Sequence, residues 1–321
     1  MAIDQHYSMA RGNGTMSYAP HVAFWAQRGR APTSELVGGN REKLSGGDCA
    51  TIATRAIGLL RDDHGPVTMR IDSAYYAVEL LARLRRERAR FTVSVPRNQA
   101  IWKTLGQIPD DAWTDALEMP GAQVAETTYT PAGWRHEPLR LIVRRVPFSA
   151  QQIAKLRGSR RLKTIHPDQL QLALDGQIEQ VHGYSFILTD IAHQPTAWIE
   201  HFHRHRAQIE ERLKDTKLGQ ALRHLPSGDT NANRVWLAAA LLALNLTALC
   251  CDLCPAAGAS GKAPDDAPLR RAAQTLRRIL FNIPARIIRT ARRTILRLPE
   301  GFRHADVFQA TLDAVYALPP P

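Results

Sequence analysis

A strand, a helix and a second strand follow one another between residues 67 and 96, and this order allows few architectures. The run VTMRID (67–72) predicts a strand that starts after the stop signal Gly65-Pro66. The segment AYYAVELLARLRRERA then has helical periodicity, and RFTVSVP (90–96) predicts the second strand. Because the connections are short, we expect the two strands to lie parallel in one sheet with the helix on its face. The sequence therefore predicts an α/β domain.

Asp72 closes the first of these strands. At the carboxyl edge of an open α/β sheet, such a residue faces the crevice in which ligands bind. The alternative is structural, because Asp72 or Ser73 is also a suitable cap for the helix that follows. The residues alone leave both interpretations open.

The segments on either side extend this prediction along the chain. Residues 18–38 are expected to form two short strands joined by a turn, and residues 46–61 are expected to be helical. From Arg97 to Ala192 the pattern changes to short strands and turns, which indicates a β-rich insertion. Helical periodicity returns at about Thr196 and again in 235–252.

The segment HFHRHRAQIEERLKDTKLG (201–219) sets basic residues around a single carboxylate. On a continuous helix, the spacing would place four side chains on one face: His203, Arg206, Glu210 and Lys217. The non-functional interpretation is a solvated helix face, in which Arg206 and Glu210 form an ordinary ion pair that stabilises the helix by a few tenths of a kcal/mol. The functional interpretation needs support from the rest of the chain.

The charge balance favours a polyanionic partner. The chain has a formal net charge of +12 and a pI of about 10.0. Residues 269–303 carry ten arginines and one acid, interleaved with apolar residues, which predicts a basic amphipathic segment. Nucleic acid is the favoured partner, because each phosphate that is neutralised releases a condensed counterion. An anionic membrane surface is the alternative.

Cysteine and histidine usage indicates a reducing compartment and no zinc site. Four cysteines are too few and too irregular for a secreted disulfide scaffold, so we expect the cytoplasm. There is no signal-peptide pattern, and the apolar stretch 235–251 is expected to be a core helix and not a membrane span. Five dispersed histidines, without paired ligands nearby, are expected not to bind zinc: His64, His166, His193, His201 and His224.

Taken together, these motifs resemble the DDE transposases of bacterial insertion sequences, in the group with a β-rich insertion between the second Asp and the Glu. That group's signature is Tyr-x2-Arg-x3-Glu-x6-Lys, and 203–217 matches its spacing with His203 in place of the tyrosine. The stretches RIDSAYY, FTVSVPRN, YSFILTD, HRHRAQIEERLKDTKLGQALRHLPSG and LRLPEG also look like this family. The resemblance runs from about Tyr18 to the end of the chain.

The resemblance implies an α/β fold with a ribonuclease H-like core, a β-rich insertion between the second Asp and the catalytic Glu, and a C-terminal helical basic tail. Its expected parts are the first half of the core (1–96), the insertion (97–192), the second half of the core with the Glu helix (193–254), a linker (255–268) and the basic helical tail (269–321).

The resemblance also implies the chemistry. Asp72 would be the second catalytic acid and Glu210 the third, and Asp4 is the sole acid upstream of the first strand pair. These carboxylates would hold two Mg²⁺ ions, with Mn²⁺ able to substitute, for strand cleavage and strand transfer during DNA transposition and recombination.

DNA contacts follow in the same way. Arg206 and Lys217 would contact phosphates near the cleaved strand, and the ring of His203 would stack on a base or ribose. In the basic tail, the expected contacts are Arg289, Arg292 and Arg293. The implied partner is double-stranded DNA, both the element ends and the target, bound by a homo-oligomer in the cytoplasm and not at a membrane.

The position of Asp4 distinguishes two functional hypotheses. The connection MARGNGTM between it and the first strand pair is shorter than expected, and almost nothing precedes it, so the chain resembles an amino-terminally shortened, truncated transposase. Asp4 is either the first catalytic acid after a local deletion or a chance residue. In the second case, the chain would be a catalytically incomplete, DNA-binding remnant. A position of Asp4 beside Asp72 would favour the enzyme.

Overall fold

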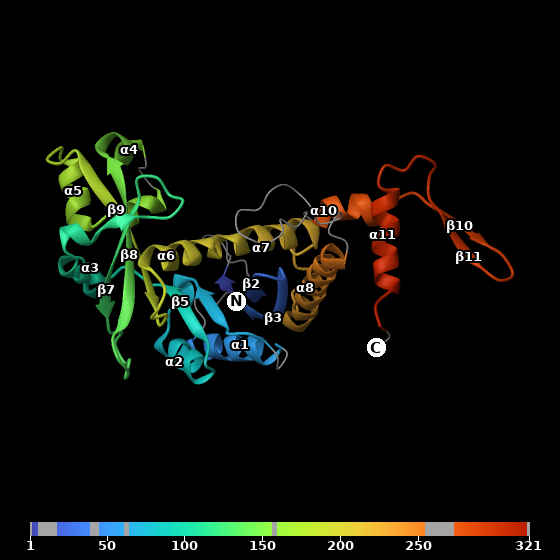
Figure 1. The fold of residues 1–321 in the computed structure, drawn as a ribbon, viewed down its shortest axis with the longest axis horizontal. Helices are drawn as coiled ribbons and strands as arrows, with labels where there is room; N and C mark the ends of the chain where they lie inside the picture. The colour runs from blue at the N-terminus through green and yellow to red at the C-terminus, as the bar shows by residue number, and fades with distance from the viewer. Residues whose placement is uncertain are drawn as a thin grey trace. The chain divides into compact units, whose positions relative to one another are not determined.

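The computed structural model describes residues 2–5, 18–38, 45–60, 64–155, 159–253 and 273–319 (Figure 1). The chain divides into two compact units. The first comprises Met1–Ala23 and Gly39–Ile209, and the second comprises Phe24–Gly38 and Glu210–Pro321. The predicted insertion, 97–192, falls wholly within the first unit.

The first unit is built on a mixed sheet. Its described strands are β1 (Ala2–Gln5), β2 (Tyr18–Trp25, which continues into the second unit), β4 (Thr68–Ile71), β5 (Arg90–Ser94), β6 (Thr114–Asp115), β7 (Gln123–Tyr129), β8 (Leu139–Ser149) and β9 (Gln180–Thr189). They follow the order β2-β1-β4-β5-β9-β8-β7-β6. β1, β4 and β5 are parallel, whereas β9, β8, β7 and β6 continue the sheet with antiparallel pairs. The insertion therefore extends the sheet that carries β4 and β5.

Short helices connect these strands. The α-helices are α1 (Gly46–Gly58), α2 (Val78–Arg86), α3 (Gln99–Lys103), α4 (Ala150–Lys155), α5 (Pro167–Leu174) and α6 (Thr196–Arg204). The 3₁₀ turns are η1 (Ser73–Tyr75), η2 (Thr104–Gln107), η3 (Asp110–Ala112), η4 (Arg160–Thr164) and η5 (His205–Ala207). A capping box between Ser45 and Asp48 starts α1 and satisfies backbone donors that the first turn leaves free.

The core of this unit forms between the sheet and the helices α1 and α2, which lie side by side (Figure 1). Leu80 and Leu84, four residues apart on α2, are fully buried, as is Phe91 on β5. Each such side chain stabilises the fold by about 1.5–3 kcal/mol through removal of apolar surface from water. The predicted strand–helix–strand order of 67–96 is confirmed, with the α-helix starting at Val78 because Asp72 caps a 3₁₀ turn first.

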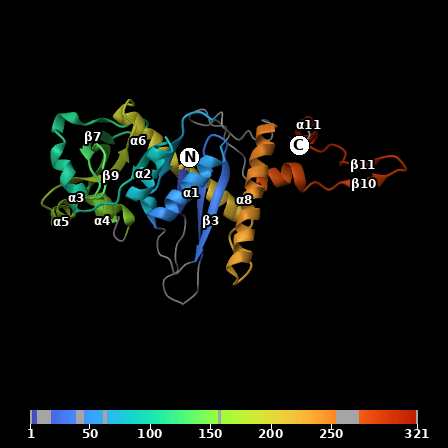
Figure 2. The same cartoon turned by 90° about the horizontal axis from the view of Figure 1, so that it is seen from below.

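The second unit combines one strand of the predicted first pair with most of the C-terminal half. Its elements are β3 (Arg30–Gly38), most of α7 (Gln208–Gly219), α8 (Thr230–Leu253), α10 (Ala273–Leu276), the π-helix η6 (Arg277–Phe281), β10 (Arg286–Arg289), β11 (Thr294–Arg297) and α11 (Ala305–Tyr316). α8 packs on β3 (Figure 2). The Asn245 side-chain oxygen accepts a hydrogen bond from the Ala31 N–H at 2.7 Å, and its amide donates to the Ala31 carbonyl at 2.9 Å.

Helix α8 can be compared with a membrane-spanning helix. Among the described residues, it is the one helix whose length and composition would suit a bilayer, and 33% of its most apolar window is buried. A single helix of this kind is weak evidence, because core helices of soluble proteins have the same properties. Its buried side includes Leu237, Leu241 and Leu244.

The prediction of a helical tail is wrong for residues 286–297. These residues form an antiparallel hairpin, in which Arg286 pairs with Arg297 and Arg289 pairs with Thr294. Pro284 cannot continue the preceding helix, because it lacks an N–H and clashes with the previous turn. The β-branched residues of RIIR and TILR then favour extended backbone.

Candidate functional site

Asp72 lies where strand β4 ends, as predicted. Its Oδ1 atom accepts hydrogen bonds from the Ser73 backbone N–H at 2.6 Å and from the Ser73 hydroxyl at 3.3 Å. Arg206 Nη1 lies 3.2 Å from the same oxygen, and 26% of the Asp72 side chain is exposed. Asp72 therefore caps the η1 turn and also presents a carboxylate at the sheet edge. Among the described residues, no hydrogen bond reaches its Oδ2 atom, which keeps lone pairs for a cation.

The backbone of Asp4 occupies the neighbouring strand at the same level. Strand β1 pairs in parallel with β4, with Ala2 opposite Arg70 and Ile3 opposite Ile71. Asp4 follows Ile3 as Asp72 follows Ile71, and parallel strands end at the same edge of a sheet. The amino-terminal segment is therefore part of the sheet, and it brings a second acidic residue to the edge where Asp72 lies.

The helix predicted across 196–219 is interrupted, so the prediction of one continuous polar face is wrong. α6 ends at Arg204, the η5 turn spans His205–Ala207, and α7 begins at Gln208. Tertiary contacts accompany the break: His203, just before it, is buried against the sheet, and Arg206, within it, pairs with Asp72. Glu210 is exposed in the first turn of α7 and belongs to the second unit, as does Lys217.

His203 lies inside the first unit and not on an open face. Only 5% of its surface is exposed. Its Nδ1 lies 2.8 Å from the Thr92 hydroxyl and its Nε2 lies 2.8 Å from the Ser94 hydroxyl, both on β5. Burial, reinforced by the positive charges of nearby arginines, holds the pKa of His203 well below 6.5. The neutral ring therefore anchors the end of α6 to β5, and it is not placed to stack on a base.

The lowered pKa values of two buried histidines should make the stability of the fold depend on pH. Burial lowers the pKa of His21 from 6.5 to about 4, although Asp48 acts in the opposite direction, and His203 is lowered in the same sense. Between pH 6.5 and about 4, the unfolded chain takes up protons that the folded chain does not, so the free energy of unfolding should fall as the pH drops. We expect His21→Gln to flatten this slope in urea unfolding, and the exposed His193→Gln to leave it unchanged. An equal slope in His21→Gln and the parent chain would contradict the assignment.

Sequence reasoning missed the polar network that supports α6. Glu200 is fully buried, and its Oε1 lies 2.5 Å from Arg144 Nη1 and 3.3 Å from Arg204 Nε. Arg70, also buried, donates to the Phe202 carbonyl at 3.1 Å, and burial lowers its pKa to about 10. The Arg144–Glu200 pair and the Arg70–Phe202 contact join residues far apart in the sequence, so no local motif signals them, whereas Glu200 and Arg204 have the i,i+4 spacing of a helical pair.

The arginines predicted in the tail are exposed. Arg289 ends β10, whereas Arg292 and Arg293 lie in the turn that leads to β11. This turn is closed by a backbone hydrogen bond from the Thr290 N–H to the Arg293 carbonyl at 2.9 Å. Exposed cations at the tip of a hairpin are accessible to phosphates.

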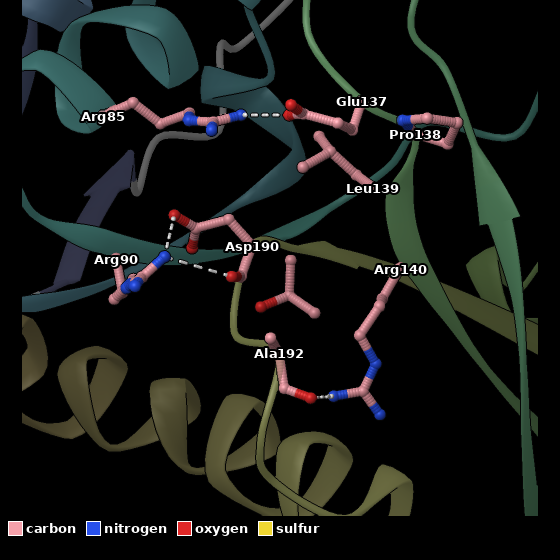
Figure 3. A pocket seen from close by; sticks show the side chains of 9 residues that line it. Arg85, Arg90, Glu137, Pro138, Leu139, Arg140, Asp190 and Ala192 are labelled. Carbon is pink, nitrogen blue, oxygen red and sulfur yellow. Dashed lines mark hydrogen bonds and ion pairs between the residues drawn. The ribbon is translucent and has the colours of Figure 1, made fainter.

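A hollow of about 170 Å³ in the first unit is lined by residues that include Arg85, Arg90 and Arg140 (Figure 3). Arg85 pairs with Glu137 at 3.6 Å and Arg90 pairs with Asp190 at 3.5 Å. Arg140 donates to three carbonyls of the loop after β9, those of Ile191, Ala192 and Gln194, and it also contacts Glu126. These guanidinium groups already have partners. Their role is therefore structural, because their pairs link α2, β8 and the end of β9.

Asp4 and Asp72 thus stand near the ends of neighbouring parallel strands in a mixed α/β fold, and Arg206 is paired with Asp72. The family model described as "Transposase DDE domain" matches residues 43–246, and a second, "Transposase DDE domain group 1", matches residues 175–320. The chain belongs to the transposase DDE domain family.

The chain is similar to piggyBac transposase in a cryo-EM structure of its synaptic complex with hairpin DNA, with a TM-score of 0.44 and 8% identity. The match covers 100% of this chain and 54% of that chain, so this chain spans about half of the length of the protein it matches. A search of curated proteins finds no match.

Proposed function

We propose that this chain is a DNA transposase that cleaves a DNA strand and transfers it to a target, with Asp4, Asp72 and Glu210 as its catalytic acids. The observation that supports this most strongly is the β1–β4 register, which carries Asp4 to the level of Asp72. The proposed core is ribonuclease H-like. The order β2-β1-β4-β5, with β1, β4 and β5 parallel, supports that assignment.

The donors fit magnesium. Carboxylate oxygens are the ligands that Mg²⁺ prefers, and Asp72 keeps its Oδ2 atom available while Ser73 and Arg206 orient the group through Oδ1. Two Mg²⁺ ions, or Mn²⁺ in their place, would activate the attacking oxygen and stabilise the leaving oxygen of a phosphodiester. Arg206 fixes the direction of the Asp72 carboxylate, and Glu210 supplies the third acid from α7.

Double-stranded DNA is the proposed partner, at both the element ends and the target. The net charge of +12 favours a polyanion. Lys217 and the exposed hairpin tip, Arg292 and Arg293, supply cations for phosphates, with Arg289 beside them. We also propose a homo-oligomer in the DNA complex and a cytoplasmic location. His203 contributes indirectly in this proposal, by anchoring α6 just before Arg206.

The test is cleavage of a supercoiled plasmid that carries this chain's gene with its natural flanks, in Mg²⁺. Glu210→Gln should abolish nicking and linearisation, because a metal ligand becomes a neutral amide. Glu211→Gln is the matched control, since it is the adjacent exposed glutamate on the same helix, and it should cleave like the parent chain. Equal cleavage by the two variants would contradict the role of Glu210. Salt-sensitive DNA binding without cleavage in any version would favour a DNA-binding remnant.

A further inference from the structure

Three potential metal ligands gather in the first unit, on elements other than the strands that end near Asp4 and Asp72. They are Glu118, in the turn between β6 and β7, and His201 and His205, at the end of α6. One ligand atom from each lies within 4.8 Å of the others. His201 Nε2 is 3.1 Å from Glu118 Oε2, and the two imidazole rings have centroids 4.3 Å apart. The expectation that His201 has no ligand partner nearby is therefore wrong.

The hydrogen bonding of His205 prepares it to bind a metal. Its Nδ1 lies 2.8 Å from the His201 carbonyl oxygen. A carbonyl can only accept, so Nδ1 carries the proton, and the Nε2 atom of the neutral ring keeps its lone pair. Metal-bound histidines are commonly oriented through a hydrogen bond from the other ring nitrogen to a carbonyl. This arrangement is already present at His205.

The turn that carries Glu118 is held in an unusual conformation. Glu118 has a φ of 50°, which is uncommon for a residue with a side chain. Backbone hydrogen bonds close the turn, from the Ala116 N–H to the Ala122 carbonyl at 2.9 Å and from the Ala122 N–H to the Met119 carbonyl at 3.0 Å. Arg204 also donates to the Leu117 carbonyl and so ties the turn to α6. The surrounding contacts thus hold Glu118 beside the two histidines.

We propose that Glu118, His201 and His205 form a zinc site that shares no ligand with the proposed magnesium site. Two imidazoles and a carboxylate suit Zn²⁺ and suit Mg²⁺ poorly, because imidazole binds borderline-soft transition metals. Three protein ligands leave the fourth tetrahedral position for water. Ligand atoms on zinc are about 3.3 Å apart, so modest side-chain rotation is needed. Glu118 can supply it, because its side chain is 60% exposed.

Local charge also permits a cation at this cluster. The pKa of Glu118 is lowered, chiefly by its hydrogen bond with His201, which keeps the carboxylate ionised. Arg204 lies beside the turn and is a fixed cation that would oppose metal binding, but its guanidinium is paired with Glu200 at 3.3 Å. A bound ion would cross-link the β6–β7 turn to His205, the residue that follows α6 and directly precedes Arg206. The site would thus stiffen the segment that positions Arg206.

Zinc titration of the untagged full chain tests the proposal. The chain is stripped with EDTA, dialysed, and titrated with Zn²⁺ by calorimetry in excess Mg²⁺, which occupies oxygen-rich sites. We expect one zinc per chain by elemental analysis. We also expect Co²⁺, used as a spectroscopic substitute, to give the visible absorption of a tetrahedral site.

Variants locate the ion. His205→Ala should weaken zinc affinity by more than about 100-fold, beyond what loss of an outer hydrogen-bond partner costs. Glu118→Gln, which changes an exposed side chain and leaves α6 intact, should weaken affinity and alter the Co²⁺ spectrum. His193→Ala, at an exposed histidine outside the cluster, and Asp72→Asn should bind zinc like the parent chain. Unchanged affinity in both His205→Ala and Glu118→Gln, or loss of zinc in Asp72→Asn, would overturn the proposal. So would a parent chain that binds no zinc.

Discussion

Asp4→Asn is expected to reduce Mg²⁺-dependent strand cleavage by roughly 10²- to 10³-fold, the range for losing one group that stabilises charge in a transition state. The substitution keeps the size of the side chain and removes its charge, so a metal ligand is lost without a change in packing volume. Asp4 lies one residue beyond the Ile3–Ile71 pair in β1, and Asp72 lies one residue beyond it, directly after β4. A cation at this edge would lose one of its two neighbouring acidic residues.

The measurement is the initial rate of plasmid nicking at several Mg²⁺ concentrations, with DNA binding measured in parallel. Asp111→Asn is the control, because Asp111 is an exposed aspartate of the same unit, in η3. Binding should be retained in both variants, since phosphate contacts come from basic side chains. A cleavage rate for Asp4→Asn within a factor of about two of the Asp111→Asn rate would show that Asp4 is not a ligand.

Glu200→Gln is expected to lower the free energy of unfolding by about 3–5 kcal/mol, the cost of breaking a buried ion pair by removing one partner. The Glu200 carboxylate is fully buried, with Arg144 at 2.5 Å and Arg204 at 3.3 Å. The side chains of Arg144 and Arg204 are only 20% and 27% exposed, so water compensates poorly for the lost negative charge.

Urea unfolding followed by circular dichroism measures this change. Glu179→Gln is the matched control, because Glu179 is an exposed glutamate of the same unit, and its effect should stay within about 0.5 kcal/mol. The double variant Arg144→Met/Glu200→Leu should be more stable than Glu200→Gln, since it removes both buried charges. A loss below about 1 kcal/mol in Glu200→Gln would show that the pair contributes no more than a surface salt bridge.

Local signals explain which parts of the fold could be predicted. The strand–helix–strand order of 67–96 was predictable because strand and helix periodicities are local, and Gly65-Pro66 marks the start. The β character of 97–192 was predictable for the same reason. The pairing of β9 with both β5 and β8 was not, because hydrogen bonds between strands join distant residues. In the tail, arginine content suggested a helix, whereas Pro284 and the β-branched residues after it favoured the hairpin.

The order of the motifs, the basic character of the chain and the position of Asp72 at a strand end follow from the amino-acid sequence alone, because all three depend on composition or on neighbours along the chain. Tertiary structure decided the rest. Parallel pairing of β1 with β4 brought Asp4 level with Asp72, and burial turned His203 into an anchor on β5. A turn after β6 placed Glu118 against the end of α6, beside His201 and His205. Strand pairing and burial depend on contacts between segments far apart in the sequence, and the spacing of residues along the chain does not predict those contacts.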